Sequence, residues 1–333
     1  MRRHYWELPI FMYLFLGGLG GGIMFLTMIF SGIVYPDNVE VIKAMWFPMF
    51  VAIACLAVGC FFLVFELGQP LSFIYVFTNS TKSVIGHGAR LLSAAMIFGL
   101  IWWIAWFPAT GVFGFLACIN PFLEFLQWFS GPCMLIAGIC GFCIMMYTGI
   151  MLSTLKAHSF WATPALPVLF TVSALSTACA ATMLAVGVHP EMGTVAMMEI
   201  VEELRSYVHT SDIFLILVEM TVLLTMILSF LGAGNKVQNK VAHRWIHGSY
   251  ALGFWGGMIC MGLGIPLLLN LFGSGVATHV IAPVLALCGG CLLRALCIYS
   301  DDRAEVPGED DYFTRLYRDA PFMRRWKYGE NEF

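Results

Sequence analysis

Apolar residues run along this chain in long blocks, and polar residues are concentrated in the short segments between them. A helix needs about 20 residues, at a rise of about 1.5 Å per residue, to cross the hydrocarbon core of a bilayer. Eight blocks reach roughly that length. They cover residues 8–34, 43–65, 86–107, 122–152, 162–188, 211–232, 247–272 and 277–299. The pattern predicts an all-α fold, a polytopic membrane helix bundle with eight transmembrane helices.

An even number of spans places both termini on the same side of the membrane, here called the N-face. The loops of the opposite face offer only Lys43 and Arg205 as basic residues. Cytoplasmic loops of membrane proteins carry an excess of Lys and Arg. We therefore expect a cytoplasmic N-face and a location in the inner, cytoplasmic membrane of the cell. The basic residues of the N-face ahead of the C-terminal tail are Arg2, Arg3, Lys82, Lys156, Lys236, Lys240 and Arg244.

Composition supports a membrane location. Hydrophobic residues make up 60% of the 333 residues and charged residues 11%, whereas soluble domains carry about 25% charged residues. So few charges exclude a water-soluble globule, and we expect contact with membrane lipid and not with nucleic acid. Residues 1–300 are predicted to form the transmembrane domain and 301–333 an aromatic-rich tail that docks on a partner subunit. The polar segment 189–210 is predicted to form a short surface helix on the opposite face.

The positions of histidine and cysteine argue against a resident redox centre. A membrane haem needs axial ligands well inside the spans, but all eight histidines fall in predicted loops or near predicted span ends. Cys140 with Cys143, and Cys288 with Cys291, have the spacing of metal ligands. Each pair lies in an apolar helix without a second pair in a polar loop, which favours small packing residues. We expect no haem and no iron–sulfur cluster in this chain.

Polar side chains gather where several spans meet the N-face. Tyr13 lies about two turns into the first span, and Tyr147 lies about as far from the end of the fourth. A quinone headgroup needs such a ring, because it requires hydrogen-bond donors for two carbonyls and protonatable groups for its reduction. Each residue alone also fits an interfacial anchor. The predicted quinone site comprises Glu7, Tyr13, Glu66, His87, Tyr147, Lys156, His158 and Arg294, with Tyr147, Tyr13 and Glu7 as catalytic candidates.

Two carboxylates mark the sixth span. Asp212 opens it at the opposite face, and Glu219 lies seven residues further in, about two turns along the same helix face. A carboxylate this deep in a bilayer costs several kcal/mol unless it is paired or neutral. Glu219 is therefore either bonded to a neighbour or part of a proton relay with Asp212.

Several motifs, in order, resemble those of the NrfD/PsrC family, the membrane subunits of polysulfide reductase and related complexes. The run from Trp6 to Gly22 resembles the first helix of that family, and residues 66–70 (Glu-Leu-Gly-Gln-Pro) resemble its motif after the second helix. Tyr147-Thr148-Gly149 and the later stretch 166–176 resemble its central signature. Phe254-Trp255, Gly289-Gly290 and Arg294 resemble features of its last two helices.

The resemblance implies an eight-helix subunit that binds menaquinone or ubiquinone and exchanges electrons with a ferredoxin-like, four-cluster iron–sulfur subunit. That subunit would connect to a molybdopterin catalytic subunit or a multihaem cytochrome, as in polysulfide, nitrite, tetrathionate or arsenate reductase-like complexes. Tyr147 matches the family tyrosine that bonds the quinone, and Tyr13 stands where one branch has a histidine. Gln69 and His87 depart from the usual arginine and tryptophan. Terminal catalysis would lie in a partner subunit.

Three alternatives remain from sequence. A secondary transporter also places polar residues on facing helices, although transporters usually show inverted repeats and broken helices. A proton-translocating subunit without quinone chemistry would use the same buried carboxylates. A purely structural anchor would leave Glu219, Tyr147 and Arg294 without a role. The basic N-face is either cytoplasmic, with cytoplasmic partners, or a docking surface for an acidic iron–sulfur subunit.

Overall fold

The computed structural model describes residues 8–36, 38–66, 84–110, 120–155, 160–186, 188, 194–232 and 236–300, and these contain helices and no strand. Several transmembrane helices contain a stretch of wider π-helix. The elements are α1 Leu8–Met28, η1 Ile29–Val34, α2 Val39–Glu66, α4 Val84–Ala105, α5 Phe107–Thr110, α6 Asn120–Trp128, α7 Ser130–Ser153, α8 Ala165–Ala185, α9 Val195–Gly232, α10 Lys236–Ile246, η4 Leu252–Gly264, α11 Ile265–Phe272, η5 Ala277–Ile281 and α12 Ala282–Tyr299.

The predicted eight-helix membrane bundle is confirmed. Eight helical segments of the described residues are long and apolar enough to cross a membrane. They are Pro9–Val34, Val39–Val64, Val84–Ala105, Ser130–Ser153, Ala165–Ala185, Val195–Gly232, Leu252–Phe272 and Ala277–Tyr299. The start of α1 and the end of α12 lie at one end of the bundle, where the rings of Phe11 and Tyr299 are 5.9 Å apart.

The fourth span is shorter than predicted, because the block at 122–152 is two helices rather than one. α6 ends at Trp128 and α7 begins at Ser130. Pro132 follows two residues later and has no N–H to continue the α6 ladder. The Ser130 hydroxyl donates instead to the Gln127 carbonyl at 2.7 Å. Apolar composition alone did not reveal this break.

The predicted separate surface helix at 189–210 is wrong from Val195 onward. Those residues are the first half of α9, one helix of 38 residues, which at 1.5 Å per residue is about 57 Å long and exceeds a bilayer core of about 30 Å. A buried stripe runs through both halves and explains the continuity. Its members are Met197, Val201, Leu204, Val208, Asp212, Ile216, Glu219, Leu223 and Met226. On the solvent side, the Tyr35 hydroxyl donates to Glu203 at 2.6 Å.

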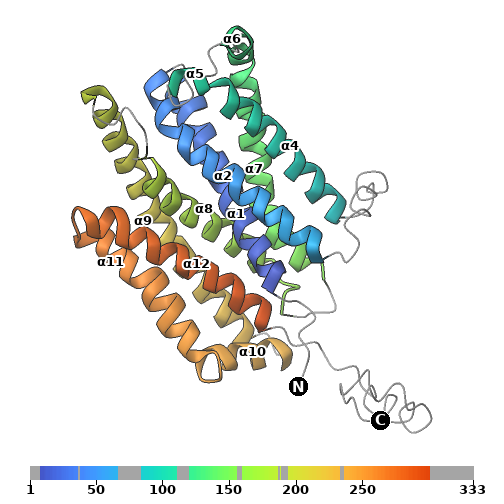
Figure 1. Cartoon of the computed structure of the whole chain (residues 1–333). Helices are drawn as coiled ribbons and strands as arrows, with labels where there is room; N and C mark the ends of the chain where they lie inside the picture. The colour runs from blue at the N-terminus through green and yellow to red at the C-terminus, as the bar shows by residue number, and fades with distance from the viewer. Residues whose placement is uncertain are drawn as a thin grey trace, which may run out of the picture.

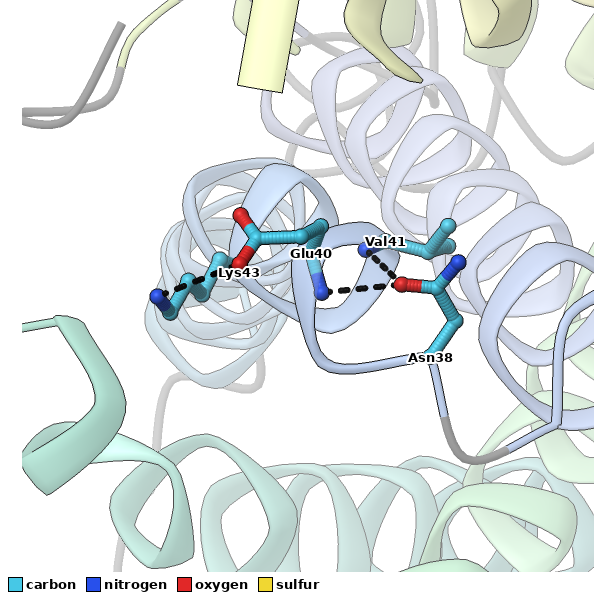
Figure 2. A network of polar contacts seen from close by, with 4 residues as sticks. All are labelled: Asn38, Glu40, Val41 and Lys43. Atoms are coloured by element: carbon cyan, nitrogen blue, oxygen red, sulfur yellow. Dashed lines mark hydrogen bonds and ion pairs between the residues drawn. The ribbon is translucent and has the colours of Figure 1, made fainter. Parts of the chain in front are cut away.

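The N-terminus of α2 is fixed by a side-chain cap. The Asn38 side-chain oxygen accepts hydrogen bonds from the backbone N–H groups of Glu40 (3.0 Å) and Val41 (3.4 Å), as Figure 2 shows. Such a cap satisfies donors that the first turn of a helix leaves without partners. Lys43, one of the few basic residues of the opposite face, is 3.6 Å from the Glu40 carboxylate within this turn. The positive charge of Lys43 is thereby partly offset.

The spans form two groups that meet at α1 and α8. One group contains α1, α2, α4 and α7, and the other contains α8, α9, η4 with α11, and η5 with α12 (Figure 1). α1 packs against both groups, since it contacts α2 and α7 on one side and α8 and α12 on the other. Side chains of α1 can therefore take part in either group.

Glycines allow α1 to occupy this central place. A Cβ added to Gly21 would lie 2.6 Å from the backbone oxygen of Gly141 on α7, so the two backbones are in direct contact. At the next residue, a Cβ added to Gly22 would lie 3.0 Å from the backbone oxygen of Ala174 on α8. Small residues at helix interfaces are how membrane bundles gain close van der Waals packing. The glycine run of the first span is thus a packing device.

Candidate functional site

Two tyrosines from α1 and α7 form the centre of the candidate site. Tyr13 and Tyr147 are both buried, with 3% and 7% of their surfaces exposed. The Tyr13 ring lies against Gly17 of its own helix and Gly59 of α2. The two phenols are close enough to interact electrostatically. Within the described residues neither hydroxyl has a hydrogen-bond partner, and neither oxygen is one of the enclosed polar atoms left without a partner, so the two hydroxyl ends are not sealed inside the protein.

Tyr147 rests on the backbone of α4. All three heavy atoms nearest to a Cβ built on Gly88 belong to Tyr147, and its hydroxyl oxygen would be 2.5 Å away. His87 is exposed in the first turn of α4, adjacent to this contact. The structure therefore brings Tyr13, Tyr147 and the N-terminal turns of α4 together, as the sequence predicted for two tyrosines at one depth.

Other predicted members of the ring cannot be placed. Glu7, Lys156 and His158 lie outside the residues that the structure describes. Glu66 is the last residue of α2, but the position of its side chain also lies outside them. The assignment of these four to a quinone site stays a prediction.

Arg294 lies on the other side of α1 from the tyrosine pair. Its guanidinium is fully buried over the rings of Phe15 and Phe170, at 5.6 and 5.5 Å from their centroids. In a helix, Phe15 points about 200° away from Tyr13, two residues earlier. A Cβ on Gly18 would also lie 3.2 Å from the guanidinium. The sequence grouped Arg294 with the tyrosines by depth, but the structure places α1 between them.

A serine joins Arg294 to Glu219. The Arg294 guanidinium donates to the Ser173 hydroxyl at 3.2 Å and to the Gly290 carbonyl at 2.8 Å. The buried Glu219 carboxylate faces the same Ser173 hydroxyl and interacts electrostatically with Arg294. The Nε of Arg294 has no partner in the described part of the chain. Ser173 and Arg294 are thus polar neighbours of the Glu219 carboxylate and limit the cost of a charge in the membrane. A part for Glu219 in a proton relay stays a prediction.

Asp212 continues this polar network toward the opposite face. Its carboxylate accepts from the Ser176 hydroxyl at 3.0 Å and from the Asn270 amide at 2.9 Å. The His209 ring is 3.1 Å from the Asn270 carbonyl. Asp212 and Glu219 are two turns apart, about 10 Å along α9, so no direct bond joins them. Ser173 and Ser176 lie three residues apart on one face of α8 and approach the two carboxylates in turn.

Sequence reasoning missed the roles of Ser173, Ser176, Asn270 and His209. Serine is common in membrane helices, so it gave no signal by itself, although the three-residue spacing of the two serines on one helix face could have done so. Among the described residues no group of three or more His, Cys, Asp or Glu side chains could hold a metal ion. The ten described cysteines are free thiols.

Comparisons with known proteins give the family. Residues 1–301 match the family described as "NrfD: Polysulphide reductase, NrfD". Protein NrfD of Escherichia coli strain K12 is 27% identical over 316 residues, which cover 88% of this chain and 92% of that protein. The C chain of polysulfide reductase from Wolinella succinogenes is 27% identical over 276 residues, covering 80% and 83%. A Protein NrfD homolog of Haemophilus influenzae is 24% identical over 282 residues, again covering 80% and 83%. The resemblance seen in the sequence is confirmed, and with its eight membrane helices and nearly full-length match the protein belongs to the NrfD family.

Proposed function

We propose that this protein is the quinone-reactive membrane subunit of a multisubunit respiratory oxidoreductase. The observation that carries the proposal is the pair of tyrosines, Tyr13 and Tyr147, whose side chains are buried near one end of the bundle and whose hydroxyls have no partner among the described residues. Such hydroxyls are available to donate to a ligand, and a hydrogen bond of this kind contributes on the order of 1 kcal/mol. A ligand with two carbonyl acceptors, such as menaquinone or ubiquinone, would supply partners for both.

The tyrosines would bind and orient the quinone. When bound, the quinone supplies two-electron, two-proton redox chemistry to the site. Tyr147 would donate its hydroxyl hydrogen to one carbonyl oxygen, and Tyr13 would provide a second donor. Because burial excludes water, these hydrogen bonds would be stronger than in solution. Glu7, Glu66, His87, Lys156 and His158 remain candidates for the rim and for proton exchange with the aqueous phase.

Asp212 and Glu219 would form a proton relay on the far side of α1. The series of contacts runs from His209 and Asn270, through Asp212 and Ser176, to Glu219, Ser173 and Arg294. Buried carboxylates with hydroxyl neighbours are the usual parts of intramembrane proton paths. The two-turn gap between Asp212 and Glu219 requires a bridging group such as water.

A proton-translocating subunit without quinone chemistry is the second candidate. The observation that favours it is the separation of the polar network from the tyrosines by α1. In that case the network would serve transport alone and Tyr147 would be a packing residue. A variant that lacks only the Tyr147 hydroxyl discriminates between the two functions.

The partners would carry the remaining cofactors. The subunit would hold neither haem nor an iron–sulfur cluster of its own. Electrons would be exchanged with a ferredoxin-like, four-cluster iron–sulfur subunit on the N-face, which would in turn connect to a molybdopterin subunit or a multihaem cytochrome. The name of the Wolinella relative, which is one lettered chain of polysulfide reductase, fits a multichain enzyme. The aromatic tail after residue 300 is the proposed contact with that partner.

The first prediction concerns the Tyr147 hydroxyl. Tyr147→Phe removes one hydroxyl and should leave folding intact, while quinol-linked turnover of the assembled complex falls on the order of 10², the scale of a lost positioned proton donor. Tyr207→Phe, the same change at an exposed position, is the matched control and should keep full turnover. If the two variants turn over quinol analogues at the same rate, the assignment of Tyr147 to a quinone site is wrong.

The second prediction concerns Glu219. Glu219→Gln keeps the volume and one acceptor for Ser173, but it cannot carry a proton at neutral pH. We expect steady-state quinol turnover to fall on the order of 10² with a near-normal KM for quinol, because binding and proton delivery would be served by different residues. Glu199→Gln, on the exposed face of α9, is the control. A raised KM with an unchanged maximal rate would assign Glu219 to the quinone site instead.

The third prediction concerns sidedness. If the excess of Lys and Arg places the N-face in the cytoplasm, a reporter fused after Phe333 will be active only there. A paired fusion within residues 189–193, expected on the opposite face, should show the reverse activity. Activity of the C-terminal reporter only outside the cytoplasm would reverse the orientation and make the basic N-face a docking surface.

A further inference from the structure

The contact between Gly88 and Tyr147 is closer than ordinary helix packing. A Cβ built on Gly88 would lie 2.5 Å from both the hydroxyl oxygen and Cε1 of Tyr147, and closer still to Cζ. No real Cβ approaches another atom so closely without a shift in one of them. The tip of the Tyr147 ring, where its hydroxyl is attached, therefore lies directly on the backbone of α4.

The neighbour at this position cannot move aside cheaply. Gly99, eleven residues along the same helix, also lacks room for a Cβ, but its nearest atoms are the terminal methyl groups of Met49 (2.8 Å) and Met24 (3.0 Å). Methionine has three rotatable bonds and adapts to such a change. Tyr147 is a rigid ring, so it can make space only by rotating about its first side-chain bonds, and that rotation carries the hydroxyl with it.

We propose that Gly88 is a positioning residue for Tyr147. Its missing side chain lets the ring lie against α4 and so fixes where the phenol hydroxyl points. This inference rests on the proposed function, since it assigns a role to the direction of that hydroxyl. A quinone carbonyl needs a donor about 3 Å away in the correct direction, and a displacement of about 1 Å at such a site can cost on the order of 10² in rate.

The test compares Gly88→Ala with Gly99→Ala in the assembled, membrane-bound complex. We expect Gly88→Ala to lower the kcat for quinol by a factor on the order of 10², the same factor as expected for Tyr147→Phe. The kcat of Gly99→Ala should stay within about threefold of the wild-type value. Protein level and thermal stability should be similar in the two alanine variants. If Tyr147→Phe lowers turnover but Gly88→Ala does not, the positioning role is wrong while the proposed function stands.

A double-mutant cycle separates positioning from packing. In a Tyr147→Ala background the ring is gone, so adding Gly88→Ala should change turnover by less than about twofold. An equal loss in both backgrounds would show that Gly88 only packs helices, and would overturn the proposal. If Gly88→Ala prevents accumulation of the protein, recovery of its level by Tyr147→Ala supports the overlap with the ring, and no recovery contradicts it. If Tyr147→Phe itself left quinol turnover unchanged, the proposed function would be wrong.

The short helix α6 carries a second, independent inference. At about 100° per residue, its residues divide into three faces. Leu123 is 4% exposed and Gln127 donates to the Ala105 carbonyl at 3.0 Å, so this face docks on the end of α4. Glu124 lies on a polar face next to it. The third face is exposed and aromatic, and consists of Phe122, Phe125, Trp128 and the following Phe129.

We infer that α6 lies in the interface of the bilayer and that its aromatic face binds lipid. The aromatic face leads directly into α7, where Leu135, Ile136 and Ile139 are exposed on a membrane span and so continue the lipid-facing surface. Trp and Phe at the end of a span are typical of the headgroup region, where an amphipathic helix lies flat. Trp128, 86% exposed, is the outermost of these side chains.

The test uses the full-length protein in bilayers of phosphatidylcholine brominated at either end of the acyl chain. The emission that depends on Trp128 is obtained as wild type minus Trp128→Phe. We expect this emission to be lost most strongly with bromine near the headgroup end. Trp161→Phe gives the control, because Trp161 is fully buried and its emission should not respond. Quenching of Trp128 by aqueous iodide alone, or by neither quencher, as a protein partner would cause, would overturn the inference.

Discussion

The close contact of α1 with both α7 and α8 is the constraint on which the arrangement of this protein depends. In a bilayer, helices gain little by hiding apolar surface from lipid, so close van der Waals packing must hold the bundle together. Gly21 against Gly141 and Gly22 against Ala174 provide that packing on two sides of one helix. As a result a single helix contributes Tyr13 to one group of spans, and Phe15 and Gly18 to the other. Bulkier residues at these glycines would push the two groups of spans apart. The tyrosine pair and the Arg294 network, which lie on the two sides of α1, would move apart as well.

Buried charge is the second constraint, and the structure meets it by sharing partners. Arg294 and Glu219 would each cost several kcal/mol alone in a membrane. The Ser173 hydroxyl accepts a hydrogen bond from Arg294 and faces Glu219, and the rings of Phe15 and Phe170 add favourable contacts with the guanidinium. Within the described part of the chain Asp212 has no such cation, but it receives hydrogen bonds from Ser176 and Asn270. Two serines on one face of α8 thus lower the cost of burying the carboxylates of α9.

The sequence was sufficient for the number of spans, the family and the shared depth of Tyr13 and Tyr147, because average hydropathy and distance from a helix end both follow directly from composition and rise per residue. It was insufficient wherever the answer depends on the direction in which a side chain points around its helix, because that direction decides which neighbour it meets. The charges at 199–203 suggested a surface helix, since an average over a window does not show that Val201 and Leu204 continue the buried stripe of α9. Arg294 has a depth similar to that of the tyrosines but faces the other side of α1, which only the packing of three helices determines. Ser173 and Ser176 belong to the stretch that resembles the family signature, but for the same reason the sequence did not reveal their approach to the carboxylates of α9.

This separation bears on how a redox site and a proton path could act together. The tyrosine pair and the Arg294 network are divided by the backbone of α1, where Gly17 and Gly18 leave no side chain to carry a proton. Coupling across α1 would be electrostatic, because a change of charge at a quinone bound beside the tyrosines would act on Arg294 and Glu219, and the low dielectric of the bundle would screen that effect only weakly. Proton transfer between the two sites through hydrogen bonds alone would require a side chain or a water molecule that bridges the two sides of α1.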